Sequence, residues 1–389
     1  MACAVVTGGR GFLGRHLVHK LLESGKWEVV RIMDLAAGLA VDADEEKALS
    51  AALESGRAQY AGVDLRNLPQ VIQALEHATV VFHMAAPDSS ISDWKLHHSV
   101  NVIGTRNVIE ACIEQGVHKL IYTSSPSVVF DYINGVKDAD ESLAYPAKLM
   151  DSYSETKAQA EALVLDANGR HGLATCAIRP SGLFGPGDRL FLPSIVAAAR
   201  AGKLKFQIGS GDNKFDWTYV ENVVHAHVCA EEALVDASGV AAGKAYFITN
   251  CEPVKFWEFL SEFLERLGYP RPQYQLPVAL VLPLACIAEW ACKQLAPLGV
   301  PMTQFTPARI RYMSLWRTFS CDRAATLLKY KPLYTVEEGI QRTVTSFQHL
   351  RASPAAGGDG KSAARWWWMV LVAVVLLAVF FQRFLHEVA

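Results

Sequence analysis

A tyrosine and a lysine four residues apart form the pair with the clearest chemical role in the sequence. Tyr153 and Lys157 lead into a stretch, 158–165, that is rich in Ala, Leu and Glu and therefore predicts a helix. The i,i+4 spacing puts both side chains on one helix face, about 5–6 Å apart at Cβ. Since a neighbouring ammonium favours the phenolate of a tyrosine, whose ordinary pKa is about 10, the pair predicts a general base and its activator. The alternative is an exposed pair without a catalytic role.

Two serines follow one of the predicted strands. Residues 119–123 (KLIYT) read as a strand, and Ser124 and Ser125 come directly after it. Doubly wound sheets bind ligands at the carboxyl ends of their strands, so a hydroxyl here is placed to hydrogen-bond a reacting oxygen. His83, in the predicted strand 79–84, is interpreted instead as a hydrogen-bonded core histidine.

Three glycines precede a predicted helix near the N-terminus. Gly8, Gly11 and Gly14 lie between a predicted strand, 4–7, and a predicted helix, 15–22. Their GxxGxxG spacing is a variant of the dinucleotide fingerprint, in which glycines allow a tight turn and close approach of backbone N–H groups to a pyrophosphate. The N-terminus of the helix adds partial positive charge there. We therefore predict a dinucleotide site.

An acidic residue indicates which dinucleotide is bound. A second predicted strand, 28–33, is followed by Asp34, about 20 residues after the last glycine, where an acid bonds the ribose hydroxyls of the adenosine half. A carboxylate there would repel a 2′-phosphate, so Asp34 favours NAD over NADP. Arg10 and Arg31 are the opposing signal, because either guanidinium can pair with such a phosphate.

Strand and helix patterns go on alternating after these segments. This rhythm predicts an α/β fold with a doubly wound parallel sheet. The further elements are expected at 58–63, 68–75, 79–84, 101–115, 119–123 and 174–178. Residues of the glycine turn and of the strand ends are expected to complete the cofactor site: Phe12, Leu13, Asp64, Leu65, Ala85 and Ala86.

The composition limits the class of protein. The 389 residues are 51% hydrophobic and carry a net charge of −2, which gives no electrostatic reason to expect a nucleic-acid partner. The eight cysteines form no CxxC pair and no Cys/His cluster at zinc spacing, so neither a disulfide framework nor a metal is expected. The first residues already read as a strand rather than as a signal peptide, which favours a cytosolic catalytic part.

The C-terminal region is unusually apolar. The run 366–381 (WWWMVLVAVVLLAVFF) has no charge, and its extension to Leu385 is long enough, at about 1.5 Å per residue, for the roughly 30 Å hydrocarbon core of a bilayer. The preceding stretch, 351–365, is small, polar and flexible in composition. These features predict a tether and a transmembrane anchor, at 351–365 and 366–385. A core helix or an interfacial helix is the alternative.

Longer phrases of the sequence resemble a known family. The chain is similar, over roughly residues 3–350, to the extended short-chain dehydrogenase/reductases, and within them to 3β-hydroxysteroid dehydrogenases. More narrowly, it resembles the plant-type sterol-4α-carboxylate 3-dehydrogenases (decarboxylating). The phrases that carry the likeness are VVTGGRGFLGRHLV, VVFHMAAPDSS, SVNVIGTRNVIEAC, LIYTSSPSVVFD, DSYSETKAQAEALV, IRPSGLFGPGD and DWTYVENVVHAHVCAE.

The resemblance implies roles for individual residues. It makes Tyr153 the general base, Lys157 its activator and a ligand of the cofactor ribose, and Ser125 the hydroxyl that orients the sterol 3-oxygen. Asn101 matches a position near the nicotinamide or its proton relay. Arg179 and Pro180 match a stretch that lines the substrate and nicotinamide side. Asp216 and Tyr219 more plausibly organise their loop than take part in chemistry.

The resemblance also implies the organisation of the chain. It divides into an NAD-binding Rossmann core (1–180), a region with the last core elements and a smaller substrate lobe (181–350), the tether and the anchor. The expected setting is the endoplasmic reticulum membrane with the catalytic domain in the cytosol. Expected partners are a sterol and membrane lipid but no nucleic acid. Homodimerisation and assembly with other enzymes of sterol C-4 demethylation are compatible with the family.

The implied function is NAD-dependent oxidation of the 3β-hydroxyl of a 4α-carboxysterol, with loss of the carboxylate as CO2. The alternative functions are those of a 3β-hydroxysteroid dehydrogenase/isomerase, another extended-family oxidoreductase such as a hydroxyflavanone-type reductase, a nucleotide-sugar epimerase, and a non-catalytic NAD-binding membrane scaffold.

One more segment of the sequence gives information about the substrate. The apolar run 276–288, interrupted by Pro277 and Pro283, is too short and kinked to span a bilayer. It predicts an interfacial or sterol-gating segment, with an ordinary core helix as the alternative.

Overall fold

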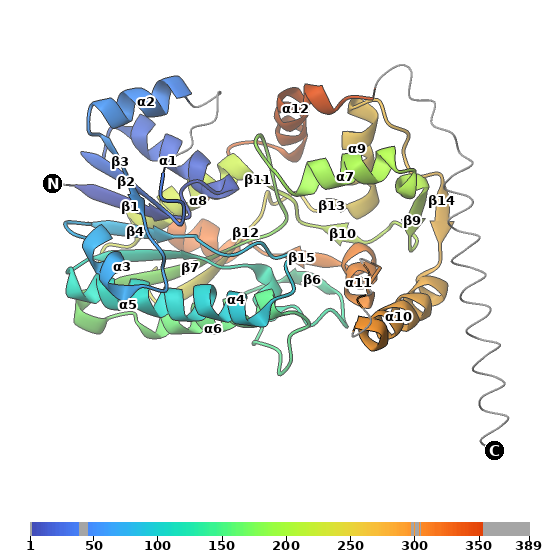
Figure 1. Cartoon of the computed structure of the whole chain (residues 1–389), viewed down its shortest axis with the longest axis horizontal. Coiled ribbons are helices and arrows are strands. Elements are labelled where there is room, and N and C mark those ends of the chain that lie inside the picture. The colour runs from blue at the N-terminus through green and yellow to red at the C-terminus, as the bar shows by residue number, and fades with distance from the viewer. Residues whose placement is uncertain (1, 39–45, 297–298, 300–302, 304, 353–389) are drawn as a thin grey trace.

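The computed structural model describes residues 2–38, 46–296, 299, 303 and 305–352. Within them, a sheet covered by helices on both faces forms one half of the molecule, and shorter strands and helices form the other half (Figure 1). The predicted anchor, 366–385, and the predicted tether, 351–365, lie outside the described residues, except for Arg351 and Ala352.

The main sheet has seven parallel strands in the spatial order β12-β7-β5-β4-β1-β2-β3. The strands are β1 (Cys3–Thr7), β2 (Val29–Asp34), β3 (Ala58–Gly62), β4 (Val80–His83), β5 (Lys119–Thr123), β7 (Ala174–Pro180) and β12 (Lys244–Ile248). The order reverses at β1, which pairs with β2 on one side and with β4 on the other. A crevice opens at the carboxyl ends of the strands at such a reversal. The predicted doubly wound parallel sheet is confirmed.

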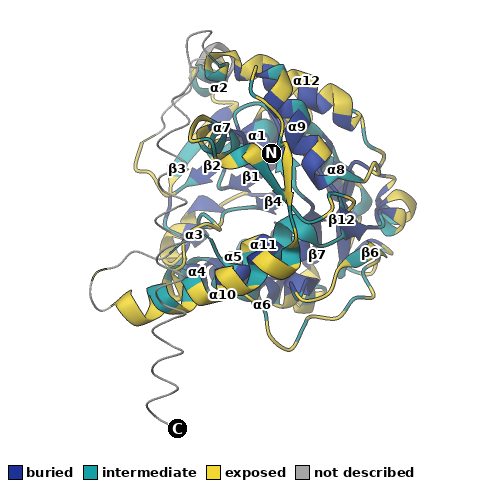
Figure 2. Cartoon of the chain, turned by 90° about the vertical axis from the view of Figure 1, so that its right-hand side faces the viewer, coloured by how far each residue is buried: buried dark blue, intermediate teal, exposed yellow. Residues whose placement is uncertain are grey.

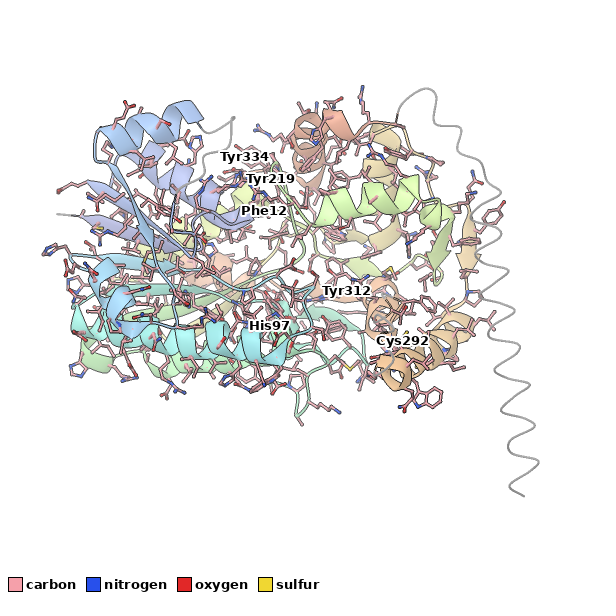
Figure 3. The ribbon with its side chains drawn as sticks, in the orientation of Figure 1. Phe12, His97, Tyr219, Cys292, Tyr312 and Tyr334 are labelled. Atoms are coloured by element: carbon pink, nitrogen blue, oxygen red, sulfur yellow. The ribbon has the colours of Figure 1, made fainter. Side chains whose placement is uncertain are left out.

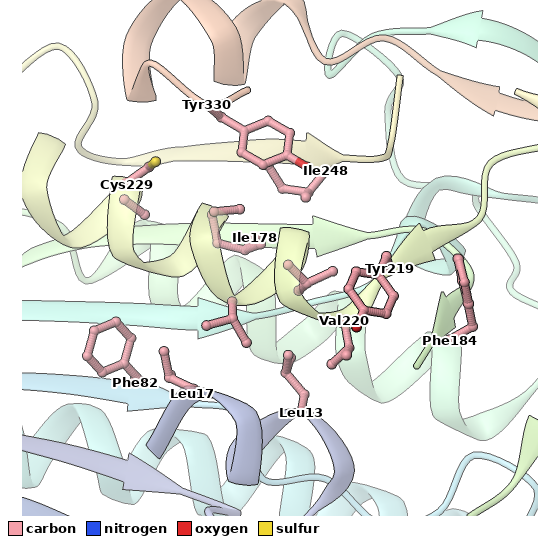
Figure 4. Packing of buried hydrophobic residues seen from close by; sticks show 14 of the residues in the cluster. Leu13, Leu17, Phe82, Ile178, Phe184, Tyr219, Val220, Cys229, Ile248 and Tyr330 are labelled. Carbon is pink, nitrogen blue, oxygen red and sulfur yellow. The ribbon is translucent and has the colours of Figure 1, made fainter. Parts of the chain in front are cut away.

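Helices cover both faces of this sheet (Figure 1). The helices on one face are α1 (Phe12–Ser24), α2 (Glu46–Glu54) and α8 (Val220–Ala233). Those on the other face are α3 (Leu68–Ala74), α4 (Trp94–His97), α5 (Thr105–Glu114) and α6 (Ser152–Asp166). Each face has its own apolar core. Leu17 of α1, Phe82 of β4 and Ile178 of β7 are fully buried in the first (Figure 4). Burial of this kind fixes the strand ends that carry the site.

The second half of the molecule contains short strands and five helices among the described residues. Its helices are α7 (Phe191–Arg200), α9 (Phe256–Arg266), α10 (Val278–Leu295), α11 (Pro307–Ser314) and α12 (Val336–Ser346). Its strands are β8 (Leu183–Phe184), β9 (Phe206–Ile208), β10 (Lys214–Phe215), β11 (Thr218–Tyr219), β13 (Val254–Lys255), β14 (Tyr274–Leu276) and β15 (Arg317–Phe319). β6 (Val136–Ala139), from the first half of the sequence, joins β15, β10 and β13 in a four-stranded sheet.

Two elements differ from the sequence prediction. The helix predicted at 101–115 begins earlier, as a π-helical segment at His98–Gly104 that continues into α5. The apolar run 276–288 is part of a longer helix, because α10 extends to Leu295 with Pro283 inside it. Pro277 precedes the first turn, where its missing N–H has no intrahelical partner to lose. Among the described residues, α10 is long and apolar enough to cross a membrane by length and composition.

Candidate active site

The glycine turn packs so closely that side chains cannot enter it. Gly8 has a φ of +68°, and a Cβ there would lie 2.8 Å from the Cα of Ala85. A Cβ on Gly14 would lie 2.2 Å from the carbonyl oxygen of Gly8. Because only glycine fits, the backbone of the turn stays open at the N-terminus of α1, where Gly11 precedes the first helical residue. This cradle fits the pyrophosphate of a dinucleotide.

The two other predicted residues of this turn lie in the first turn of α1. Phe12 is half-buried, with its ring edge-on to His16 at 5.7 Å, and Leu13 is buried in the core between α1 and α8. The side chain of Leu13 therefore packs inside the protein. Its backbone N–H belongs to the first turn of α1, where N–H groups have no intrahelical partner and can bind a phosphate. Figure 3 shows Phe12 near Tyr219, at the border between the two halves of the molecule.

Asp34 ends β2 beside the glycine turn. Its Oδ2 accepts a hydrogen bond from the backbone N–H of Arg10 at 2.9 Å. Arg31 faces elsewhere, since its guanidinium donates to the carbonyl oxygens of Ala74 and Glu76 and to Gln59. The arrangement fits NAD, because a carboxylate occupies the position next to the turn while Arg31 is committed to other partners.

The remaining predicted cofactor residues follow the ends of three strands. Asp64 and Leu65 follow β3, Ala85 and Ala86 follow β4, and Pro180 ends β7. The Asp64 carboxylate is bound by Arg66 at 2.6 Å, and this hydrogen bond lowers the pKa of Asp64. The backbone of Ala85 touches the glycine turn, as described above, so the end of β4 forms one wall of the cradle. A role for each of these residues in binding remains a prediction.

The predicted tyrosine–lysine pair lies on α6. Asp151 caps this helix by accepting a hydrogen bond from the backbone N–H of Ser154 at 2.7 Å, which starts α6 just before Tyr153. Lys157 is buried, and its ammonium donates to the carbonyl oxygen of Thr123, at the end of β5, at 2.5 Å. The ammonium thus joins α6 to the carboxyl edge of the sheet.

Burial dominates the ionisation of both members of the pair. The pKa of Tyr153 is raised to about 12, mainly by burial, with the Asp151 carboxylate acting in the same direction and Arg317 against it. Burial also lowers the pKa of Lys157 to about 7, against the effect of Glu161. The ammonium of Lys157 donates to Thr123, and its predicted part in activating the phenol stays a prediction.

Ser125 is the more accessible of the two candidate serines. It is half-buried and caps a short helical turn, Pro126–Val129, with its oxygen accepting hydrogen bonds from the N–H of Ser127 at 3.2 Å and from its hydroxyl at 2.9 Å. Its own hydroxyl hydrogen stays available to a substrate oxygen. Ser124 is 4% exposed, and its hydroxyl has no hydrogen-bond partner. The geometry is consistent with the prediction of Ser125.

Asn101 lies in the π-helical segment beside α6. Its side-chain amide donates to the hydroxyl of Thr156 at 3.0 Å, and its carbonyl oxygen is buried without a hydrogen-bond partner. A buried acceptor without a donor commonly marks the place of a water or ligand. This arrangement fits a relay residue, although that role stays a prediction.

A buried arginine that belongs to no recognised sequence motif faces the same region. Arg317, on β15, is 5% exposed, and its guanidinium lies over the rings of Phe130, Phe215 and Tyr312 at 5.0, 5.4 and 5.2 Å. Its Nε has no hydrogen-bond partner, and no carboxylate oxygen lies within 4.0 Å of the guanidinium in the described part of the chain.

Arg317 is close enough to the predicted base to affect its ionisation. The positive charge opposes the rise in the pKa of Tyr153 that burial causes, and it does the same for Tyr132 and Tyr312. The guanidinium also hydrogen-bonds the side chain of Tyr132, and its charge acts against the rise that burial causes in the pKa of the Asp216 carboxylate. Arg317 therefore brings a buried positive charge into the region of Tyr153, without an ion pair within 4.0 Å among the described residues. No motif in the sequence pointed to Arg317, since it stands in a three-residue strand far along the chain from the base.

The contacts of His83 and Asp216 agree with the structural roles expected for them. His83 is fully buried, and its ring nitrogens lie 2.7 Å from the hydroxyl of Thr7 and 2.9 Å from that of Thr105, which confirms a core histidine. Asp216 accepts a hydrogen bond from the N–H of Phe319 at 2.7 Å, which fits its predicted part in organising a loop.

Arg179, expected beside the substrate, is instead buried in an ion pair with Glu161 at 2.5 Å. The pairing carboxylate lies on α6, so the guanidinium is used to hold that helix against β7. The part of the chain that the structure describes holds no cluster of three or more His, Cys, Asp or Glu suited to a metal.

The parallel sheet, the glycine cradle and a tyrosine–lysine pair at the strand ends define an extended short-chain dehydrogenase/reductase fold. Residues 5–278 match the profile described as "3-beta hydroxysteroid dehydrogenase/isomerase family". The chain belongs to this family, as its resemblance to it predicted.

Curated relatives extend over most of the chain. The chain is 57% identical to 3beta-hydroxysteroid-dehydrogenase/decarboxylase isoform 1 of Arabidopsis thaliana, over 90% of this chain and 80% of that protein. It covers 64% of isoform 2 from the same plant, at 55% identity. It is also 42% identical to the sterol-4-alpha-carboxylate 3-dehydrogenase, decarboxylating, of Mus musculus, over 90% of this chain and 91% of that one.

Solved structures share the fold at lower identity. A UDP-glucose 4-epimerase of Thermus thermophilus in complex with NAD superposes with a TM-score of 0.63 at 23% identity, over 89% of this chain and 99% of that one. A UDP-glucuronic acid 4-epimerase of Bacillus cereus, with UDP-glucuronic acid and NAD, reaches 0.66 at 20% identity, over 90% and 99%. These likenesses show the fold alone.

Proposed function

We propose that this protein oxidises the 3β-hydroxyl of a 4α-carboxysterol to the 3-ketone, with NAD as the hydride acceptor and with loss of the C4 carboxylate as CO2. The names of the Arabidopsis and mouse relatives support this activity. The observation that carries it in the structure is Arg317, a buried guanidinium whose positive charge acts on Tyr153 and which has no ion-pair partner within 4.0 Å among the described residues. A substrate with a carboxylate one carbon away from the reacting alcohol supplies that partner.

The dehydrogenation step follows from the groups around Tyr153. Tyr153 must lose its own proton to act as the base, and the positive charge of Arg317 favours that state against the effect of burial. The phenolate then takes the proton of the 3β-hydroxyl, while the hydroxyl of Ser125 hydrogen-bonds the same oxygen. The glycine cradle and Asp34 would hold NAD, which would supply the hydride acceptor for C3. Lys157 holds α6 to the end of β5, which fixes the position of the phenol.

Decarboxylation follows from the chemistry of the product. A 3-ketone with a 4-carboxylate is a β-keto acid, so the bond from C4 to the carboxylate breaks and its electron pair forms an enolate with the ketone. Tyr153 and Ser125 hydrogen-bond the enolate oxygen. The proton that Tyr153 took from the alcohol balances the one that C4 gains, so the sum is alcohol and NAD giving ketone, CO2 and NADH.

We further propose that the protein works at the endoplasmic reticulum membrane, with residues 366–385 as an anchor and the described body on the cytosolic side. The uncharged apolar run in the sequence and the water-insoluble substrate support this location. Homodimerisation and assembly with other enzymes of sterol C-4 demethylation also belong to this proposal.

Replacement of Arg317 by methionine tests the carboxylate assignment. We expect Arg317→Met to lower kcat/KM for a 4α-carboxysterol by about 100-fold or more, since a charged hydrogen bond contributes about 1.5–3 kcal/mol and the phenol also loses its nearby cation. Turnover of a 3β-hydroxysterol without the carboxylate should fall much less. Initial rates of NADH formation with both sterols provide the comparison.

Arg317→Lys serves as the control, because it keeps the charge and should retain more activity than the methionine variant. Equal losses on the carboxylated and the plain sterol would contradict a carboxylate site at Arg317. Such a result would favour a 3β-hydroxysteroid dehydrogenase of broader substrate range.

A further inference from the structure

Two cysteines that are far apart in the sequence meet at one threonine. Cys251 follows β12 of the seven-stranded sheet, and Cys321 follows β15 of the four-stranded sheet. The Sγ of Cys321 lies 3.2 Å from both the backbone nitrogen and the Oγ1 of Thr249. The backbone N–H of Cys251 donates to the same Oγ1 at 2.9 Å. Thr249 thus holds both cysteines in one place.

The two thiols are also in direct contact, because they hydrogen-bond each other. This hydrogen bond lowers the pKa of Cys251 and raises the pKa of Cys321, so that Cys321 keeps its proton and donates it towards a thiolate on Cys251. Burial and the carboxylates of Asp216 and Asp322 act against the lowering at Cys251 without cancelling it. Sulfurs in this arrangement need only a small movement to reach the disulfide distance of about 2.05 Å.

The two members of the pair differ in accessibility. Cys251 is exposed, whereas Cys321 is buried. Cys251 also has a φ of +56°, in the left-handed region that is unfavourable for a residue with a side chain. The buried thiols of Cys112 and Cys176 provide the contrast, because burial raises the pKa of both. An accessible thiol of lowered pKa beside a buried second thiol is the arrangement of a peroxide-reactive cysteine and its resolving cysteine.

We propose that Cys251 and Cys321 are a redox modification site, at which hydrogen peroxide converts the two thiols into a reversible disulfide. The Cys251 thiolate attacks one peroxide oxygen. An S–O bond forms, the O–O bond breaks, and the hydroxide that leaves takes up the thiol proton to give water and a sulfenic acid. The Cys321 sulfur then attacks the Cys251 sulfur, so that an S–S bond forms and a second water leaves with the Cys321 proton. In sum, the two thiols lose two electrons and two protons, and the peroxide becomes two molecules of water.

The disulfide would join the two halves of the molecule. β12 is buried from Ala245 to Ile248 (Figure 2), and β15 carries Arg317, so the bond would connect the main sheet to the strand that holds the buried guanidinium. The body of the protein is proposed to face the cytosol, where thiols are kept reduced, and both cysteines are free thiols in the structure. Formation of the disulfide does not depend on the proposed function.

Peptide mapping of the full chain after exposure to hydrogen peroxide tests the pair. Samples taken at increasing times are blocked with iodoacetamide, digested and analysed by mass spectrometry, with and without dithiothreitol. We expect a linked peptide that contains Cys251 and Cys321 to form at least about tenfold faster than Cys286 is oxidised. Cys286 is the matched control, since it is an exposed thiol outside the pair, on α10 at the surface (Figure 2). Dithiothreitol should release the two peptides again.

Two variants separate the two steps. In Cys321→Ser the sulfenic acid has no resolving thiol, so dimedone should label Cys251, whereas Cys251→Ser should leave Cys321 reduced. Far-ultraviolet circular dichroism checks that each variant is folded, and the unaltered protein decides the proposal if one is not. Oxidation of Cys286 with both members of the pair still reduced would overturn the proposal. A sulfinic acid on Cys251 beside a reduced Cys321, or a disulfide from Cys251 to a second copy alone, would overturn it as well.

Discussion

At the scale of residues, the site depends on three charged or ionisable groups that share a desolvated space. Tyr153 is the proposed base, Lys157 fixes its helix to β5, and Arg317 supplies a positive charge that acts on the phenol. The i,i+4 pattern was sufficient to predict the first two. Arg317 could not be found in this way, because its place beside Tyr153 arises from tertiary packing of a three-residue strand.

Tyr153→Phe removes the phenol oxygen and little else. We expect NADH formation with the sterol to fall at least about 1,000-fold, because general acid–base groups contribute about 10²–10⁴-fold to rates. Fluorescence titration with NADH should give nearly unchanged affinity, since the glycine cradle and Asp34 are intact. A variant that keeps full turnover would exclude Tyr153 as the base.

At the scale of elements, the strands were predicted most accurately. The ends of β1, β5 and β7 fall within two residues of the sequence prediction, because buried parallel strands read as continuous apolar runs bounded by turns. The π-helical segment at His98–Gly104 was not foreseen, since its residues follow the same apolar pattern as an α-helix. The extent of α10 was underestimated, because Pro283 was taken to break the helix that contains it.

The fit between β1, the glycine turn and α1 leads to a prediction at this scale. In Gly14→Ala the added Cβ would meet the Gly8 oxygen at 2.2 Å and the Cα of Gly9 at 2.8 Å, both backbone atoms. The turn and helix must move apart, so we expect NADH affinity to fall at least about tenfold and stability to drop by about 1–3 kcal/mol. Calorimetric titration and chemical unfolding measure the two effects.

Gly239→Ala is the matched control for this prediction. It lies in a loop between α8 and β12, and a Cβ there would meet the carbonyl oxygen of Asp236 at 3.2 Å, a much milder contact. Its NADH affinity should equal that of the unaltered protein. If Gly14→Ala also bound NADH normally, the cradle would not be the dinucleotide site.

At the scale of the whole molecule, buried histidines make stability depend on pH. Burial lowers the pKa of His83 to about 3 and of His227 to about 4, whereas both are near 6.5 in an unfolded chain. Between those values the unfolded chain binds protons that the folded chain does not bind. These two histidines therefore lower the free energy of unfolding as the pH falls below about 6.5. Burial raises the pKa of Asp216 to about 7, which acts in the opposite sense over part of this range.

A comparison of variants isolates the contribution of one histidine. The His227 ring lies 2.8 Å from the hydroxyl of Thr123 and 2.8 Å from the carbonyl oxygen of Val223, so it is held as a neutral ring. We expect His227→Gln to reduce the slope of unfolding free energy against pH by about 1.4 kcal/mol per pH unit between pH 5 and 6. His19→Gln, at an exposed position, should leave the slope unchanged, and urea unfolding across that range measures both. An identical slope for the His227 variant would contradict its neutral burial.

The proposed function requires that oxidation at C3 and loss of the C4 carboxylate are linked. The most direct measurement incubates the purified full chain with NAD and a 4α-carboxysterol labelled with ¹⁴C in the carboxyl group, and follows NADH and ¹⁴CO2 together. We expect equal amounts of the two products, with both reduced to background in Tyr153→Phe. NADH formed without ¹⁴CO2, and a stable 3-keto-4-carboxylate as the product, would contradict the proposed function.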